Sequence, residues 1–180
     1  MKIETSYKLS EKYIEKEDKD IMKLKTYVDE SYEYYKYPVL LIATTTCDFK
    51  CCIESGIPIT VCQNEPWLNK PTCEISDIML IQMYNENPIT KAICFAGFEP
   101  FKQFDEIKTF ISEFRKTNED LVILYTGYYE SEIEDKIQQL KRFPNIIIKF
   151  GRFKPDKPHH IDPILGVELA SSNQYAEKIS

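Results

Sequence analysis

The chain has 180 residues, of which 43% are hydrophobic and 29% charged, with a net charge of −6 and a pI near 5.1. These values are typical of a globular domain that can bury a substantial core. The acidic balance argues against nucleic-acid binding through a broad basic face. The N-terminal residues lack the apolar segment of a signal peptide, and no apolar run approaches the roughly 20 residues of a membrane helix. We therefore expect a cytoplasmic protein without membrane association.

The order of apolar segments predicts the secondary structure. Residues 1–36 are charged and rich in tyrosine, which indicates an N-terminal extension beside a main domain over residues 37–180. Apolar runs and helical spacing in that domain predict, in chain order, strand 39–43, a loop over 47–75, helix 76–84, strand 92–96, helix 103–115, strand 121–125, helix 131–140 and strand 146–150. Ser131 and Glu134 have the spacing of a capping box at the start of the last helix. This alternation predicts an α/β fold with a mostly parallel sheet.

Distinctive residues follow the predicted strands. Cys47 follows the first strand, Gly97 and Glu99 the second, and Thr126 and Gly127 the third. Ligands of parallel sheets bind at the carboxyl ends of the strands. We therefore expect a binding site at this edge.

The end of the fourth strand is also polar. Gly151 and Arg152 follow it, and Lys149 interrupts its apolar run. A lysine at such a position is either exposed at an edge or part of a polar site. We expect it to be exposed.

Six cysteines suggest metal chemistry: Cys47, Cys51, Cys52, Cys62, Cys73 and Cys94. In a reducing cytosol, clustered cysteines are more often metal ligands or catalytic thiols than disulfides. Soft thiolates select zinc, Cu(I) or iron–sulfur clusters, and a structural zinc site typically uses two close pairs of ligands. Cys47 and Cys51 form one such pair, but no second pair follows. Three thiolates on a four-iron cluster would leave one iron open to substrate. A zinc site and plain buried thiols remain alternatives, and we expect Cys94, inside an apolar strand, to be core.

Six segments then occur in a distinctive order: Cys47-x₃-Cys51, Cys62-Gln63-Asn64, Ala96–Pro100, Tyr125–Tyr128, Phe150–Phe153 and Ser171–Gln174. Together, over about residues 38–175, they resemble the anaerobic ribonucleoside-triphosphate reductase activating proteins, a branch of the radical-SAM superfamily. Cys62 follows Cys51 at a longer spacing than in that family. Cys52 could replace Cys51 as a ligand, and Cys51 is preferred because it keeps the x₃ spacing.

The resemblance implies a partial (βα) barrel of the radical-SAM type with a cluster at its open end. It implies that Cys47, Cys51 and Cys62 hold a [4Fe-4S] cluster that reductively cleaves S-adenosylmethionine (SAM). The resulting 5′-deoxyadenosyl radical would install a glycyl radical on a glycyl-radical enzyme, the anaerobic ribonucleoside-triphosphate reductase. Flavodoxin or ferredoxin would donate the electron.

The resemblance also assigns cofactor-binding residues. Gly97 would approach the amino group of SAM, Glu99 would hold that ammonium, and Thr126 and Gly127 would line the adenosine pocket. Each residue has a simpler alternative role: a turn glycine, an acid at a helix start, or an ordinary strand-to-helix turn. Asn64 is expected to cap the segment after the last cysteine.

Two other functions remain open. One is a small radical-SAM enzyme that acts on a small molecule or peptide. The other is a zinc-stabilised binding module without catalysis. We expect His159 and His160 to lie in a solvated loop rather than at a metal.

Overall fold

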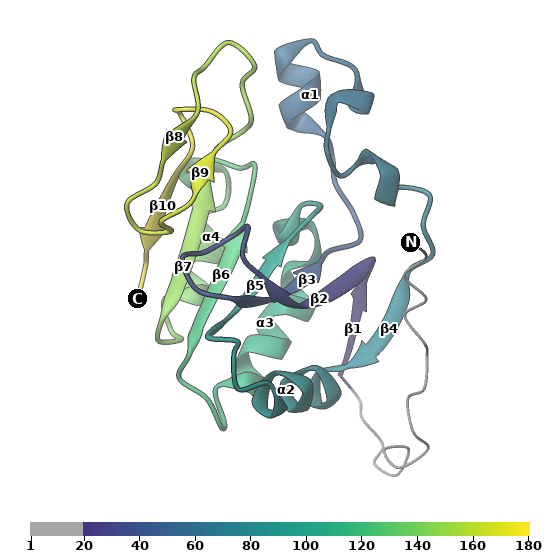
Figure 1. Ribbon diagram of the computed structural model, residues 1–180, viewed down its shortest axis with the longest axis vertical. Helices are drawn as coiled ribbons and strands as arrows, with labels where there is room; N and C mark the ends of the chain where they lie inside the picture. The colour runs from purple at the N-terminus through teal and green to yellow at the C-terminus, as the bar shows by residue number, and fades with distance from the viewer. Residues whose placement is uncertain (1–19) are drawn as a thin grey trace.

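The computed structural model describes residues 20–180, which form a mixed α/β fold around a six-stranded sheet (Figure 1). The strand order across the sheet is β10 (Tyr175–Lys178), β7 (Ile146–Phe150), β6 (Leu121–Tyr125), β5 (Ala92–Ala96), β3 (Val39–Ala43) and β2 (Thr26–Ser31). The four central strands are parallel, and both edge strands are antiparallel to their neighbours. The expected α/β fold with a mostly parallel sheet is confirmed, and the partial barrel stays a prediction.

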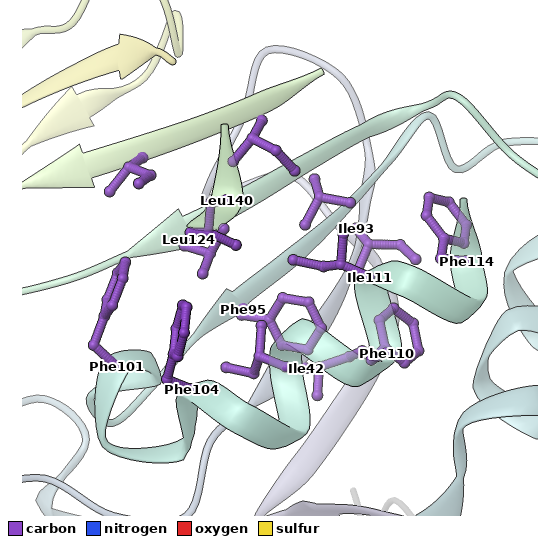
Figure 2. Close-up of a cluster of buried hydrophobic side chains, with 14 of the residues drawn as sticks. Ile42, Ile93, Phe95, Phe101, Phe104, Phe110, Ile111, Phe114, Leu124 and Leu140 are labelled. Carbon is purple, nitrogen blue, oxygen red and sulfur yellow. The ribbon is translucent and has the colours of Figure 1, made fainter. Parts of the chain in front are cut away.

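All three longer helices cover one face of the sheet. The parallel strands step across the sheet in chain order, so right-handed crossovers place every connecting helix on the same side. These helices are α2 (Asp77–Glu86), α3 (Phe104–Phe114) and α4 (Glu134–Leu140). Figure 2 shows aromatic side chains of α3, including Phe104 and Phe110, against Phe95 and Leu124 of the sheet. This buried cluster fixes the sheet and so fixes the loops at its carboxyl edge.

The opposite face of the sheet is covered by segments far apart in sequence. Alternate strand residues such as Leu41 and Cys94 pack there against Tyr35 and Leu165. Cys94 is fully buried, which confirms it as core. The described part of the N-terminal extension joins the same body, because β2 pairs with β3.

Several short elements were not expected. They are β1 (Ile21–Leu24) paired with β4 (Cys73–Ser76), α1 (Lys50–Ser55), β8 (His160–Ile161) paired with β9 (Glu168–Leu169), and the 3-10 helices η2 (Ile59–Val61), η3 (Glu65–Trp67), η4 (Pro100–Gln103) and η5 (Glu130–Glu132). Within residues 20–180, no helix has the combined length and apolar character needed to cross a membrane.

The expected capping box at Ser131 and Glu134 is wrong. The chain first forms η5, and the carboxylate of Glu132 accepts a hydrogen bond from the Tyr129 N–H at 2.9 Å. Because Glu132, two residues before Glu134, makes the capping hydrogen bond to the backbone, α4 begins only at Glu134. Ser76 caps the start of α2, since its hydroxyl accepts a hydrogen bond from the Met79 N–H at 3.2 Å.

Candidate metal centre

A cavity of about 420 Å³ lies at the carboxyl edge of the parallel strands. All seven residues predicted for the site line it: Cys47, Cys51, Cys62, Gly97, Glu99, Thr126 and Gly127. The topology explains this convergence, because the loops after β3, β5 and β6 leave the sheet at the same edge. The structure therefore brings together what the sequence spreads over 81 positions, from residue 47 to residue 127.

A tight turn joins the first two cysteines. Phe49 has a left-handed backbone with φ of 53°, and α1 begins at the next residue. Such a conformation costs a non-glycine residue on the order of 1–3 kcal/mol and is typical of functional turns. The Phe49 ring packs edge-on against Phe98 at 6.0 Å, and its N–H donates to the Cys47 Sγ at 3.3 Å. The turn reverses the chain so that Cys47 and Cys51 face the same cavity.

The three predicted ligands are partly buried thiols. Burial raises the pKa of Cys47 to about 12 and that of Cys51 to about 11, and it also raises the pKa of Cys62. Cys51 lies close enough to interact electrostatically with both of the others. These thiols need a bound cation to become thiolates, which is what a metal centre supplies.

Cys52 differs from its neighbour in exposure. It is the buried residue of α1, although it also touches the cavity, and its Sγ lies 3.9 Å from the Sγ of Cys51. The choice of Cys51 as ligand stays a prediction.

The donor set fits a cluster. Among residues 20–180, no group of three or more His, Cys, Asp or Glu side chains is arranged around one metal ion. The ligands of an iron–sulfur cluster bind separate irons, so their sulfurs lie farther apart than the ligands of a single ion. The thiols of Cys47, Cys51 and Cys62 around one cavity are compatible with that wider arrangement.

Glu99 is buried beneath the cavity with three hydrogen bonds to its carboxylate. The donors are the Thr126 hydroxyl at 2.7 Å, the Gly127 N–H at 2.9 Å and the Phe101 N–H at 3.1 Å. An ionised carboxylate offers about four acceptor sites, so one remains for a ligand. Burial raises the pKa of Glu99, and the three donors oppose that rise. Glu99 thus caps η4, as its simpler role requires, and still faces the cavity.

The expectation that Lys149 is exposed is wrong. It is only 7% exposed and lines the cavity, because β10 covers the outer edge of β7 and strand alternation turns Lys149 inward. Its ammonium donates to the Gly151 carbonyl at 3.0 Å and lies 5.9 Å from the centre of the Tyr125 ring. Desolvation lowers the pKa of Lys149 to about 8. Its interruption of an apolar strand was the sequence signal for a polar site.

The loops that carry the site are tied to one another. Asn64 does not cap its segment; its side chain instead donates to the Gly97 carbonyl. The Glu99 N–H donates to the Thr46 carbonyl at 2.9 Å. Gly97 has φ of 85°, and a Cβ there would lie 3.1 Å from both Ala43 and Trp67. Gly97 thus allows Ala43 and Trp67 to pack closely against its backbone, and its approach to the amino group of SAM stays a prediction.

Replacing Gly97 with Ala should destabilise the protein by more than the same change at Gly56. Both glycines have left-handed backbones, which cost an alanine about 1–2 kcal/mol. Only Gly97 is also crowded, since nothing lies within 4 Å of a Cβ at Gly56. Denaturant unfolding of the two variants measures the difference, and equal losses would contradict tight packing at Gly97.

Sequence reasoning missed Tyr34, which comes from the N-terminal extension and lines the cavity. Its carbonyl accepts a hydrogen bond from the Tyr125 hydroxyl at 2.6 Å. His159, also at the cavity, has an exposed side chain 3.4 Å from Glu168, as expected for a solvated histidine. His160 instead lies in β8 and is partly buried.

Residues 40–175 match the family model of the 4Fe-4S single cluster domain. The chain belongs to this family. The match includes β3, β5, β6 and β7 and the loops after them, which line the cavity. Family membership therefore supports a [4Fe-4S] cluster as the bound group. No curated protein and no solved structure gave a match.

Proposed function

We propose that this protein is a radical-SAM enzyme that holds a [4Fe-4S] cluster on Cys47, Cys51 and Cys62. One observation carries the proposal: in a domain of the 4Fe-4S family, the three predicted cysteine ligands, a buried carboxylate and a buried ammonium converge on one cavity. The bound cluster would supply one electron and an open iron for the reductive cleavage of SAM to methionine and a 5′-deoxyadenosyl radical. The cavity residues bind and orient the molecule that is cleaved.

The charges of the cavity match the amino-acid end of SAM. The remaining acceptor site of Glu99 suits the ammonium, and the Lys149 ammonium suits the carboxylate. Thr126 and Gly127 already hold Glu99 in place, so their contribution is to orient that carboxylate. The aromatic rings of Tyr34 and Tyr125 offer apolar surface to the adenosine end.

We further propose that the radical is passed to a glycine of a partner enzyme, an anaerobic ribonucleoside-triphosphate reductase, with flavodoxin or ferredoxin as electron donor. The support is the ordered resemblance of six motifs, each of which contributes at least one residue to the cavity. Mixing the reduced protein with such a reductase and SAM should yield a glycyl-radical signal in electron paramagnetic resonance (EPR) spectra. A signal-free mixture that still cleaves SAM would redirect the proposal to another substrate.

A small-molecule substrate is the second candidate. The cavity of about 420 Å³ is lined by apolar and aromatic side chains beyond the cysteines, such as Tyr34 and Phe153. Such a lining suits a compact ligand beside SAM. Protein-free extracts that accelerate SAM cleavage would favour this candidate.

Reduction of the cluster-loaded protein under anaerobic conditions should release 5′-deoxyadenosine from SAM. The Cys47→Ala variant should release none, because the cluster cannot form without its ligand. Chromatography of the quenched mixture measures the product. A fully loaded protein that yields no 5′-deoxyadenosine with strong reductant would contradict SAM cleavage, whereas a colourless protein with one zinc would support the binding module.

A further inference from the structure

The segment that carries Cys47 and Cys51 contacts the ends of β6 and β7 through four polar side chains. The Tyr128 hydroxyl donates to Asp48, Lys50 pairs with Glu132 at 3.0 Å, Glu54 pairs with Arg152 at 3.0 Å, and the Ser55 hydroxyl donates to the Phe153 carbonyl at 3.4 Å. We call these contacts the rim clamp.

Arg152 is the centre of the rim clamp. Its side chain is 3% exposed, and its two terminal nitrogens donate to the two oxygens of Glu132 at 2.7 and 2.6 Å. Its Nε faces Glu54 as an ion pair without hydrogen-bond geometry, and its guanidinium lies 4.8 Å from the centre of the Tyr129 ring. Arg152 holds the pKa of Glu132 down to about 2. Arg152 is buried and Glu132 is partly exposed, and a bidentate pair between a guanidinium and a carboxylate is strong and directional.

The clamp holds an element that has little other support. α1 has six residues, too few for a stable isolated helix, and its buried side chain is Cys52 alone. Ile53 is 70% exposed, so the apolar side chains of α1 contribute little packing. Arg152, by contrast, follows β7 of the sheet by two residues, and Glu132 lies in η5 directly before Ile133 and α4, which pack into the core. The strain at Phe49 adds to the need for external contacts.

We propose that Arg152 and Glu132 are positioning residues that hold the cysteine segment against the rim, so that its thiolates are in place for the cluster. Neither side chain lines the cavity itself. The proposal rests on the cluster and not on SAM cleavage, so the retention of the cluster tests it separately from 5′-deoxyadenosine release.

The test measures how fast the anaerobically loaded protein loses its cluster to a chelator, followed by visible absorption. Arg152→Lys removes the bidentate geometry but keeps the charge, and Glu132→Gln removes the charge but keeps the shape. Each should speed cluster loss about tenfold, as expected for the loss of one charge-assisted hydrogen bond. The matched control is Glu113→Gln, which breaks an exposed ion pair between Glu113 in α3 and Lys116 just after it and should leave the rate unchanged.

Three further readouts separate a positioning role from a contribution to overall stability. The apo forms of the variants should unfold within a few degrees of the parent, because the clamp fixes α1 and not the core. The double variant should lose the cluster no faster than the faster single variant, because the two residues act as one unit. The EPR spectrum of the reduced cluster should shift in Arg152→Lys and not in Glu113→Gln.

Unchanged cluster loss in both clamp variants would overturn the proposal. The proposal would also be overturned if the apo forms of the clamp variants were destabilised enough to account for the faster cluster loss, since Arg152 would then stabilise the fold as a whole. If the Arg152 variant does not fold, Glu54→Gln tests the same clamp from its exposed side, where a small acceleration is expected and no acceleration contradicts the proposal.

Discussion

Replacing Cys47, Cys51 or Cys62 with Ala is expected to abolish cluster binding. Each removes one of three thiolates, and the two that remain cannot hold a cluster against loss to solvent. The parent protein, purified without oxygen, should carry about four irons and four sulfides per chain, the content of one [4Fe-4S] cluster. Iron and sulfide analysis together with the visible spectrum measures the loss.

Cys52→Ala provides the matched control. It sits beside Cys51 on α1 and is the more buried of the two, so its loss should leave most of the cluster. If Cys52→Ala loses the cluster and Cys51→Ala keeps it, the ligand assignment is wrong. Cys94 is fully buried in β5, away from the cavity. The Cys94→Ala variant should retain the cluster, and its free energy of unfolding should fall by about 1 kcal/mol.

Replacing Lys149 with Met is expected to stabilise the apo-protein while weakening the binding of SAM. A pKa of about 8 instead of 10.5 means that folding disfavours the charged form by roughly 3 kcal/mol, at about 1.4 kcal/mol per pKa unit. This cost is fully present below the folded pKa and is relieved as the pH rises from about 8 towards 10.5. Methionine has a similar shape and removes it. Denaturant unfolding at pH 7 and pH 10 should show a large difference between the proteins only at pH 7.

Binding is the second half of this prediction. The loss of a charge-assisted hydrogen bond to the SAM carboxylate should weaken binding about 10- to 100-fold. Decarboxylated SAM is the matched probe, because it lacks the group that Lys149 is proposed to hold. The parent should bind SAM more tightly than this probe, and Lys149→Met should bind the two alike. If Lys149→Met still prefers SAM, the lysine does not hold the carboxylate; if neither ligand binds the parent, SAM is not the ligand.

The sequence predicts the four parallel strands to the residue, because each is an unbroken apolar run covered on both faces. Those strands then place Cys47, Glu99 and Thr126 at one edge without further information. Lys149 was misjudged because its environment depends on β10, a four-residue strand with one small apolar side chain, Ala176, which gives little indication of a strand in the sequence. Tyr34 was missed for a similar reason: its place in the cavity depends on a contact with Tyr125 across 91 positions of the chain.

The segments around Tyr35 and Leu165, which cover the sheet face opposite the helices, also affect when the site can form. Tyr34 and Gln174 both line the cavity, and the Lys36 N–H donates to the Leu165 carbonyl at 2.8 Å. A contact between Lys36 and Leu165 closes most of the chain into a loop, which is entropically costly and slow compared with forming neighbouring strand–helix units. During synthesis, β3, β5 and β6 can pair and pack against α2 and α3 before residues 165–174 have left the ribosome. We therefore expect the cavity wall to close after the core has formed, and the cluster to be enclosed only once residues 165–174 have packed against the sheet.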